Sequence, residues 1–203
     1  MKVIGITGGV GAGKSTVLSY LSKRKGAQVV QADLVGHEVM APGGPCCGPI
    51  LKLFGERVQR KDGSIDRAKV AAVVFADKGK LEALNKIVHP AVKKEILSRI
   101  TQSREQGYSY FFLEVALLFE DHYDAICDDL WYIYADEETR KRRLTASRGY
   151  SEEKIEGIFA SQMSSSDFFA GCDRAIDNCN SFQEACGEID DVMAQLGIKK
   201  IHE

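Results

Sequence analysis

The sequence lacks an excess of charge of either sign and lacks any long apolar run. Its 203 residues include 27 Lys and Arg against 29 Asp and Glu, a formal net charge of −2. We therefore expect no nucleic-acid or anionic-membrane partner, and a small-molecule substrate is favoured. No segment approaches the roughly 18 to 20 apolar residues that cross a bilayer, and the first residues are typical of a strand and a glycine turn rather than a signal peptide. These absences predict a cytoplasmic protein.

Metal-binding cysteine patterns are also missing. The chain has six cysteines and four histidines, but it has no CxxC pair and no spacing that matches a metal site. We expect free thiols and no zinc ligand among them. Internal repeats, low-complexity tracts and domain linkers are absent, and the 44% apolar content is sufficient for one sizeable core,. No sequence feature specifies an oligomeric state.

Glycine, in contrast, is concentrated in one stretch near the start of the chain, GITGGVGAGKST. Five glycines fall within nine residues from Gly5 onward, although such a run loses conformational entropy on folding and offers no side chain to a core. The stretch follows an expected strand, Lys2 to Thr7, and precedes apolar residues at helical spacing from Ser15 to Arg24. A turn that merely joins a strand to a helix would not need this many glycines.

The spacing Gly8-x-x-x-x-Gly13-Lys14-Ser15 matches the P-loop, in the strand-loop-helix context that its mechanism requires. Glycines allow backbone N–H groups to converge on a phosphate, and the following helix adds the positive end of its dipole. We expect Lys14 to reach the β and γ phosphates of a nucleotide and the Ser15 hydroxyl to coordinate Mg²⁺. The loop predicts nucleotide binding but leaves the phosphate acceptor open.

Further short apolar runs predict the rest of a sheet. The expected strands are Ala27 to Gln31, Tyr110 to Val115, Leu130 to Tyr134 and Arg174 to Ile176. Runs that are apolar throughout are typical of strands covered on both faces, and helical stretches lie between them. The pattern predicts an α/β fold of three layers with a mostly parallel five-stranded sheet, as one domain over residues 1–203 whose core is 1–33, 108–136 and 163–203.

Two helical segments interrupt this alternation. The first, 34–107, is expected to be a helical insertion that binds the acceptor, with Asp66 capping one helix and Pro90 in the first turn of another. The second, 137–162, is expected to be a mobile lid of two helices, the later one starting after Ser151.

Two carboxylates stand near the ends of expected strands. Asp33 follows the second strand, at the edge where open α/β sheets bind ligands, so it could accept a proton from an acceptor hydroxyl. The alternative makes Asp33 the N-cap of a helix that starts at Leu34, and the two roles are compatible. Glu114 closes the apolar run of the third strand and could lie beside Mg²⁺ or the substrate, or be paired to an arginine as part of the structure.

A basic run, Arg140 to Arg143, lies on the first lid helix. Such a run is usually a solvated face, here with Glu137 and Glu138 one turn earlier to pair with it. On a lid beside a P-loop, however, one or two arginines would neutralise the charge of a transferring phosphoryl group. Arg140 and Arg143 are favoured over Arg148, because a spacing of three places both on roughly one helix face.

Several motifs outside the P-loop occur in a familiar order. They are QAD at 31–33, SIDR at 64–67, IVHP at 87–90, LLFE at 117–120, the arginine-bearing lid with Gln162 near its end, and DRAIDN at 173–178. With these motifs, the chain resembles the dephospho-coenzyme A kinase family over nearly its full length. Members of that family use ATP to phosphorylate the ribose 3′-hydroxyl of dephospho-CoA, the last step of coenzyme A synthesis.

The resemblance implies a role for each matching residue. The residues expected to hold the ATP phosphates are Gly11, Ala12, Gly13, Lys14, Ser15 and Thr16. Asp33 would be the base, Arg140 and Arg143 would contact ATP, and Asn178 would lie near the adenine. The residues expected on the acceptor side are Arg67, His89, Glu114 and Leu117, although His89 could simply start a helix with Pro90.

The sequence departs from the family at Ala116, where proline is usual, and in the lid, which is one residue longer between Arg143 and Arg148. Two other functions stay open. One is a P-loop kinase for another small acceptor, such as a nucleoside or nucleoside monophosphate. The other is a nucleotide-dependent binding module, although the N-K-x-D motif of GTPases is absent.

Overall fold

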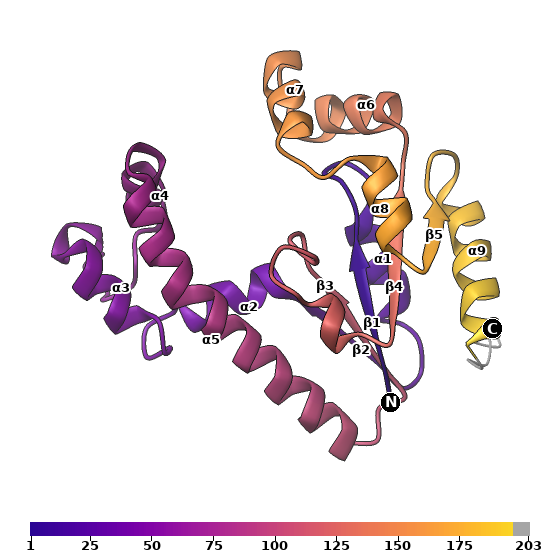
Figure 1. The fold of residues 1–203 in the computed structure, drawn as a ribbon, viewed down its shortest axis with the longest axis horizontal. Coiled ribbons are helices and arrows are strands. Elements are labelled where there is room, and N and C mark those ends of the chain that lie inside the picture. The colour runs from indigo at the N-terminus through magenta and orange to yellow at the C-terminus, as the bar shows by residue number, and fades with distance from the viewer. Residues whose placement is uncertain (197–203) are drawn as a thin grey trace. The chain divides into compact units, whose positions relative to one another are not determined.

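Figure 1 shows the fold of the chain in a computed structural model that describes residues 1–196. The chain divides into two compact units. One unit is Val30–Gln102, and the other is built from the chain before and after it. Every strand except β2, which crosses the boundary, belongs to the second of these units, so we call it the sheet unit and Val30–Gln102 the helical unit.

The sheet has five strands in the order β2-β3-β1-β4-β5. Their bounds are β1 Lys2–Thr7, β2 Ala27–Gln31, β3 Tyr110–Glu114, β4 Asp129–Tyr134 and β5 Arg174–Asp177. The central strand β1 pairs in parallel with β3 and β4, and β4 pairs in parallel with β5. The predicted α/β fold with a mostly parallel five-stranded sheet is confirmed. Its parallel order brings the carboxyl ends of β1, β3, β4 and β5 to one edge.

One face of the sheet packs against two helices, α1 (Lys14–Leu21) and α9 (Phe182–Gln195). The buried side chains between them include Ile6, Phe112, Trp131, Leu18 and Ile189. Because both faces of a central strand are covered, β1 is buried from its second residue to its end, and β4 is buried at every position but its last,. This core fixes the start of α1 directly after the glycine-rich loop.

The opposite face of β4 packs against α8 (Ser165–Gly171). The ring of Phe168 stacks on Tyr132 with 4.8 Å between the centroids. A Cβ atom at Gly171 would come within 2.7 Å of the Phe119 ring, so this helix end approaches the segment after β3 too closely for a side chain. That segment contains a short 3-10 turn, η2 (Asp124–Ile126).

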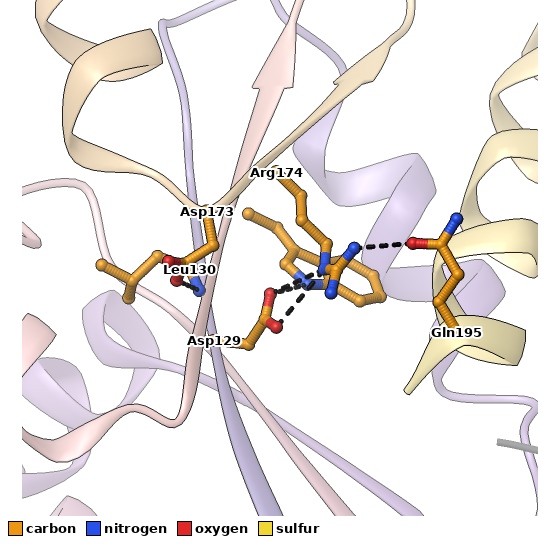
Figure 2. Close-up of polar contacts among 6 residues, drawn as sticks. Asp129, Leu130, Asp173, Arg174 and Gln195 are labelled. Carbon is orange, nitrogen blue, oxygen red and sulfur yellow. Dashed lines mark hydrogen bonds and ion pairs between the residues drawn. The ribbon is translucent and has the colours of Figure 1, made fainter. Parts of the chain in front are cut away.

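A polar cluster joins the amino ends of β4 and β5 to α9. The Asp129 carboxylate is 3.2 Å from Arg174 Nε and accepts a hydrogen bond of 2.8 Å from Trp131 Nε1. Figure 2 shows Arg174 between Asp129 and Gln195, whose Oε1 accepts a 2.8 Å hydrogen bond from Arg174 Nη1. Because Asp129 is buried, these donors compensate the cost of removing its charge from water. The cluster fixes the register of β5, and hence the place where β5 ends.

Two further helices follow β4, α6 (Glu137–Arg148) and α7 (Glu152–Ala160), as the sequence predicts. Ser151 is the N-cap of α7, and its side chain accepts from the Lys154 amide. The turn between the helices uses Gly149 at φ 61°, a conformation that glycine adopts without a Cβ penalty.

The helical unit contains α2 (Ala32–Val39), α3 (Cys47–Phe54), the 3-10 turn η1 (Glu56–Val58), α4 (Arg67–Ala76) and most of α5 (Lys78–Glu105). The structure describes all of residues 33–107 and has no strand there, as predicted. Asp66 is the N-cap of α4, with its side chain accepting from the Lys69 amide at 3.3 Å. Among residues 1–196, no helix has both the length and the apolar content to cross a membrane.

The prediction that Pro90 lies in the first turn of a helix is wrong. Pro90 lies inside α5, a single helix of 28 residues. A proline in a helix removes the hydrogen bond to the carbonyl four residues earlier. Here both Pro90 and Lys86 are exposed, so water can hydrate the carbonyl that loses its partner. Val92, Ile96 and Ile100 are buried beyond Pro90, and this packing favours continuation of the helix.

Candidate active site

The glycine-rich loop between β1 and α1 uses backbone conformations that favour glycine. Gly8, Gly11 and Gly13 have φ angles of 147°, 86° and 91°, which residues with a Cβ atom rarely adopt. Gly8 also lies against β4, since a Cβ atom there would be 2.5 Å from the Ile133 carbonyl oxygen. Gly13 is the N-cap of α1. Sterics thus account for three of the glycines in this loop, and we call residues 8–15 the P-loop.

The carbonyl groups of the P-loop accept hydrogen bonds from side chains. Lys14 Nζ donates to the carbonyl of Gly8 at 2.6 Å and, more weakly, to that of Gly9 at 3.4 Å. Arg140 Nε donates to the Val10 carbonyl at 2.9 Å, and Asn178 Nδ2 donates to the Ala12 carbonyl at 2.7 Å. The last two donors belong to α6 and to the residue after β5. The loop is therefore held by groups that are distant in the sequence.

Several amide groups of the same loop have no such partner. Within residues 1–196, the N–H groups of Gly11, Gly13 and Ser15 make no hydrogen bond to the protein. Unpaired amides at the start of a helix are the usual donors to a phosphate, and the helix dipole adds positive potential there. The carbonyls are thus occupied while these amides remain available, which is the arrangement that an anionic ligand requires.

Lys14 and Glu114 meet beside the loop. Lys14 Nζ is 3.9 Å from Glu114 Oε1, and Glu114, the last residue of β3, is only 8% exposed. The cation that the structure places beside Glu114 is thus a lysine of the P-loop. The attraction holds Lys14 at the loop, where its charge can also serve a phosphate.

A magnesium ion fits the oxygen donors of this region. The Ser15 side chain is exposed at the second position of α1, and Glu114 supplies a carboxylate near Lys14. Among the described residues, no group of three or more His, Cys, Asp and Glu could hold a metal. Mg²⁺ does not need such a cage, since it is commonly held by one or two protein oxygens together with substrate phosphates.

Arg140, on α6, is packed against the P-loop. A Cβ atom at Gly9 would be 2.4 Å from the Arg140 Cζ, so the guanidinium lies directly against the loop backbone. Its Cζ is also 4.1 Å from the centroid of the Phe159 ring, on α7. Burial lowers the pKa of Arg140 from its ordinary value, but a guanidinium stays charged at neutral pH.

Arg143 lies one turn further along α6 and contacts the loop near Asn178. Its Nη2 donates to the backbone carbonyl of Asn178 at 2.7 Å, and its Nη1 to the Ala12 carbonyl at 3.4 Å. The spacing of three therefore places both arginines on the loop side of α6, as expected. Other cations of α6 have different contacts: Lys141 pairs with Glu137 at 3.3 Å, and Arg148 lies over the Tyr150 ring.

Two residues without a predicted role at the loop also belong to this site. Gln162 Oε1 accepts from the Val10 amide at 3.2 Å and from Arg140 Nη2 at 2.6 Å. Phe159 supports the same guanidinium. Gln162 appears in the sequence only as a motif residue, and nothing marks Phe159. Phe159 lies near the end of α7, and Gln162 lies in the turn after it. No local pattern specifies how this part of the chain meets the P-loop.

The remaining predicted residues belong to other elements of the fold. Leu117 is 47% exposed in the turn after β3. Asp33, Arg67 and His89 belong to the helical unit: Asp33 is exposed in the first turn of α2, Arg67 is exposed at the start of α4, and His89 is partly buried within α5. Their roles toward an acceptor stay predictions.

The alternative that makes Asp33 a helix N-cap is wrong, and so is the expectation that the helix starts at Leu34. The cap is Gln31, with φ −109° and ψ 120°, and α2 begins at Ala32. Asp33 is therefore already helical, because β2 continues into the helix without a turn. The other proposed use of Asp33 does not depend on capping.

Comparison with known proteins agrees with these features. The family model for dephospho-CoA kinase matches residues 2–184. The chain is 40% identical to a dephospho-CoA kinase of Symbiobacterium thermophilum, over 94% of this chain and 79% of that protein. It is 35% identical to a dephospho-CoA kinase of Shouchella clausii, over 95% and 97% of the two chains. A crystal structure of TT1252 from Thermus thermophilus superposes with a TM-score of 0.80 at 28% identity, covering 96% of this chain and 97% of the other.

The structure and the comparisons lead to the same classification. A parallel sheet carries a P-loop with available amides, and two arginines of α6 contact that loop. The likeness extends over nearly the whole chain and is not confined to the P-loop. The chain belongs to the dephospho-CoA kinase family.

Proposed function

We propose that this chain transfers the γ-phosphoryl group of ATP to the ribose 3′-hydroxyl of dephospho-CoA, which yields ADP and coenzyme A. The observation that carries the proposal is a P-loop with unpaired amides at Gly11, Gly13 and Ser15, in a chain whose family model spans residues 2–184. The cytoplasmic location expected from the sequence is part of the same proposal.

The P-loop would bind the donor. The amides of the loop would donate to phosphate oxygens, and Ala12 in the loop and Thr16 directly after it would also contact these oxygens. Lys14 would exchange its contacts with the Gly8 and Gly9 carbonyls for the β and γ phosphates,. Arg140 and Arg143 would add positive charge as the phosphoryl group is transferred, because negative charge accumulates on its oxygens. Asn178 would hold the loop next to the adenosine.

The helical unit would receive the acceptor. Asp33 would accept the proton of the 3′-hydroxyl while the hydroxyl oxygen forms a bond to the γ phosphorus of ATP. The bond between that phosphorus and the bridging oxygen of ADP then breaks, so one P–O bond forms and one is lost. Arg67 and His89 would contact dephospho-CoA, together with Leu117 and Glu114 from the sheet unit.

Magnesium would be held by the Ser15 hydroxyl together with phosphate oxygens. When bound, it would neutralise charge on the β and γ phosphates. Glu114 would keep Lys14 beside the loop through their ion pair, whose N–O distance is 3.9 Å.

The direct test is an assay of purified protein with ATP, Mg²⁺ and dephospho-CoA, with ADP and coenzyme A quantified by mass spectrometry. We expect both products in equal amounts. Lys14→Ala should lower turnover on the order of 100-fold or more, whereas Lys23→Ala, at an exposed position after α1, should not. Asp33→Asn should lower turnover at least about 100-fold without weakening ATP binding, and Asp191→Asn, at an exposed position of α9, is its control.

An acceptor panel distinguishes this proposal from a neighbouring one. Adenosine, nucleoside monophosphates and dephospho-CoA would be compared at equal concentration. If transfer to a nucleoside or a nucleoside monophosphate is faster, that molecule is the acceptor in place of dephospho-CoA. ATP binding without transfer to any of them would overturn the kinase proposal.

A further inference from the structure

Gln162 connects the lid to the P-loop through one atom. Its Oε1 accepts a hydrogen bond from the backbone amide of Val10 at 3.2 Å and another from Arg140 Nη2 at 2.6 Å. The two donors belong to the loop and to α6, whereas Gln162 itself follows the end of α7. A single carboxamide oxygen therefore sets the separation between a loop amide and a lid guanidinium.

The guanidinium of Arg140 is fixed on three sides. Nε donates to the Val10 carbonyl at 2.9 Å, Nη2 donates to Gln162, and the Phe159 ring lies 4.1 Å from Cζ. Within residues 1–196 the Nη1 group makes no hydrogen bond to the protein. A guanidinium carries five N–H donors in a rigid plane, so fixing the Nε and Nη2 side also fixes the direction of the remaining donors.

The chemistry of the carboxamide matters as much as its position. An amide oxygen accepts hydrogen bonds from a cation without carrying a negative charge, so Gln162 orients Arg140 and leaves its net charge intact. A carboxylate in the same place would also accept these bonds but would offset the charge that a phosphoryl group needs. The side chain also occupies the Val10 amide, which leaves the later loop amides as the donors to phosphate.

We propose that Gln162 is a positioning residue for phosphoryl transfer, which orients the Arg140 guanidinium against the P-loop without neutralising it. The inference rests on the proposed function only in that ATP is the phosphoryl donor. Gln162 acts through Arg140 and the loop and does not itself contact the reacting atoms. Its loss should therefore lower the rate of transfer more than the affinity for ATP.

The test is a double-mutant cycle between positions 162 and 140. Gln162→Met removes both hydrogen bonds at similar side-chain length, and Arg140→Met removes the guanidinium. We expect Gln162→Met to lower kcat on the order of 10-fold to 100-fold, with less than about a threefold change in KM for ATP. In the Arg140→Met background, the same substitution should change kcat by less than about threefold, because its target is gone.

Two further variants sharpen the result. Gln162→Glu keeps the acceptor oxygens but adds a negative charge, so it should also lower kcat, and again only while Arg140 is present. Gln102→Met, at an exposed position of α5, is the matched control and should leave kcat unchanged. If Gln162→Met does not fold, Gln162→Asn enters the same cycle, because its shorter side chain cannot span both donors.

The outcomes separate this inference from the proposed function. Nucleotide affinity, measured by titration with a fluorescent ATP analogue, and ATP hydrolysis without acceptor are followed alongside transfer to dephospho-CoA. If the wild-type chain does not transfer phosphate to dephospho-CoA, the double-mutant cycle is calculated from the kcat of ATP hydrolysis instead. Equal losses of kcat in both backgrounds, or an unchanged kcat in Gln162→Met, would overturn the positioning role. If the Gln162→Glu variant has the kcat of the wild type, the argument that Gln162 must be uncharged is overturned.

Discussion

The side-chain amide of Asn178 donates a hydrogen bond of 2.7 Å to the carbonyl oxygen of Ala12, which lies 166 residues earlier in the chain. Both residues are buried. Asn178 follows β5, whose opposite end is fixed by the cluster of Asp129, Arg174 and Gln195 (Figure 2). The position of the P-loop backbone is therefore tied to the register of an edge strand of the sheet.

Replacing Asn178 should weaken ATP binding. Asn178→Ala leaves the Ala12 carbonyl with only the longer 3.4 Å contact to Arg143, and loss of a buried hydrogen bond costs about 1 to 3 kcal/mol. We expect the Kd for a fluorescent ATP analogue to rise about fivefold or more. Asn180→Ala, at an exposed position in the same loop, should bind as the wild type does. Equal affinities for the two variants would refute the role of Asn178.

A side chain at Gly13 should disrupt the same contact. A Cβ atom there would be 2.3 Å from Asn178 Nδ2, in addition to the strain of φ at 91°. Gly43→Ala provides the matched control, because Gly43 has a similar φ of 81° but no atom within 4 Å of the place that a Cβ would occupy. Backbone strain alone costs of order 1 to 3 kcal/mol. Thermal unfolding should therefore show a clearly larger decrease in Tm for Gly13→Ala than for Gly43→Ala.

The polar cluster at the start of β4 should contribute more to stability than a surface ion pair. Asp129→Ala leaves Trp131 Nε1 and Arg174 without their buried acceptor, and we expect the free energy of unfolding to fall by about 2 to 4 kcal/mol. Glu137→Ala removes the exposed partner of Lys141 and should cost less than about 0.5 kcal/mol. Urea titrations of both variants check this, and similar costs would contradict it.

Stability should fall at alkaline pH through Cys127. Burial, together with the charges of Asp128 and Asp124, raises the pKa of the Cys127 thiol from 9.0 to about 12. Above pH 9 the folded state keeps a proton that the unfolded state releases. The contribution of the Cys127 thiol to the free energy of unfolding is therefore complete below pH 9 and is lost as pH rises toward 12. One proton changes the unfolding constant by at most about tenfold per pH unit.

Cys127→Ala isolates that contribution. The difference in unfolding free energy between wild type and variant, measured by urea titration under reducing conditions, should become smaller between pH 8 and pH 11. A difference that stays constant over this range would show that Cys127 does not titrate differently in the two states.

Local patterns were sufficient for much of the fold. Lys2–Thr7 and Asp129–Tyr134 form strands because apolar and β-branched runs favour them, and the caps at Asp66 and Ser151 require only a side chain and an amide three residues later. The prediction for Pro90 fails because it rests on local preference alone. That preference for a helix start is real, but burial of Val92 and its neighbours favours a continuous helix.

The candidate site divides in the same way. The phosphate-binding pattern of Gly8 to Ser15 could be predicted from the sequence, because glycine conformations and a helix start produce it within eight consecutive residues. The spacing of Arg140 and Arg143 on one helix face was also predictable. The hydrogen bonds of Gln162 and Asn178 to loop groups could not be predicted, since they join residues that are distant in the sequence and meet only in the packed fold.

The sequence by itself predicted a phosphate-binding loop between its first strand and first helix, and its motifs indicated the kinase family. The tertiary structure decided which groups hold that loop: Lys14 from within it, Arg140 from α6, Gln162 from the turn after α7, and Asn178 from the end of β5. The physical reason is the separation along the sequence of the residues that interact. Backbone conformation depends on neighbours a few residues away, whereas the donors to buried loop carbonyls depend on sheet order and strand register.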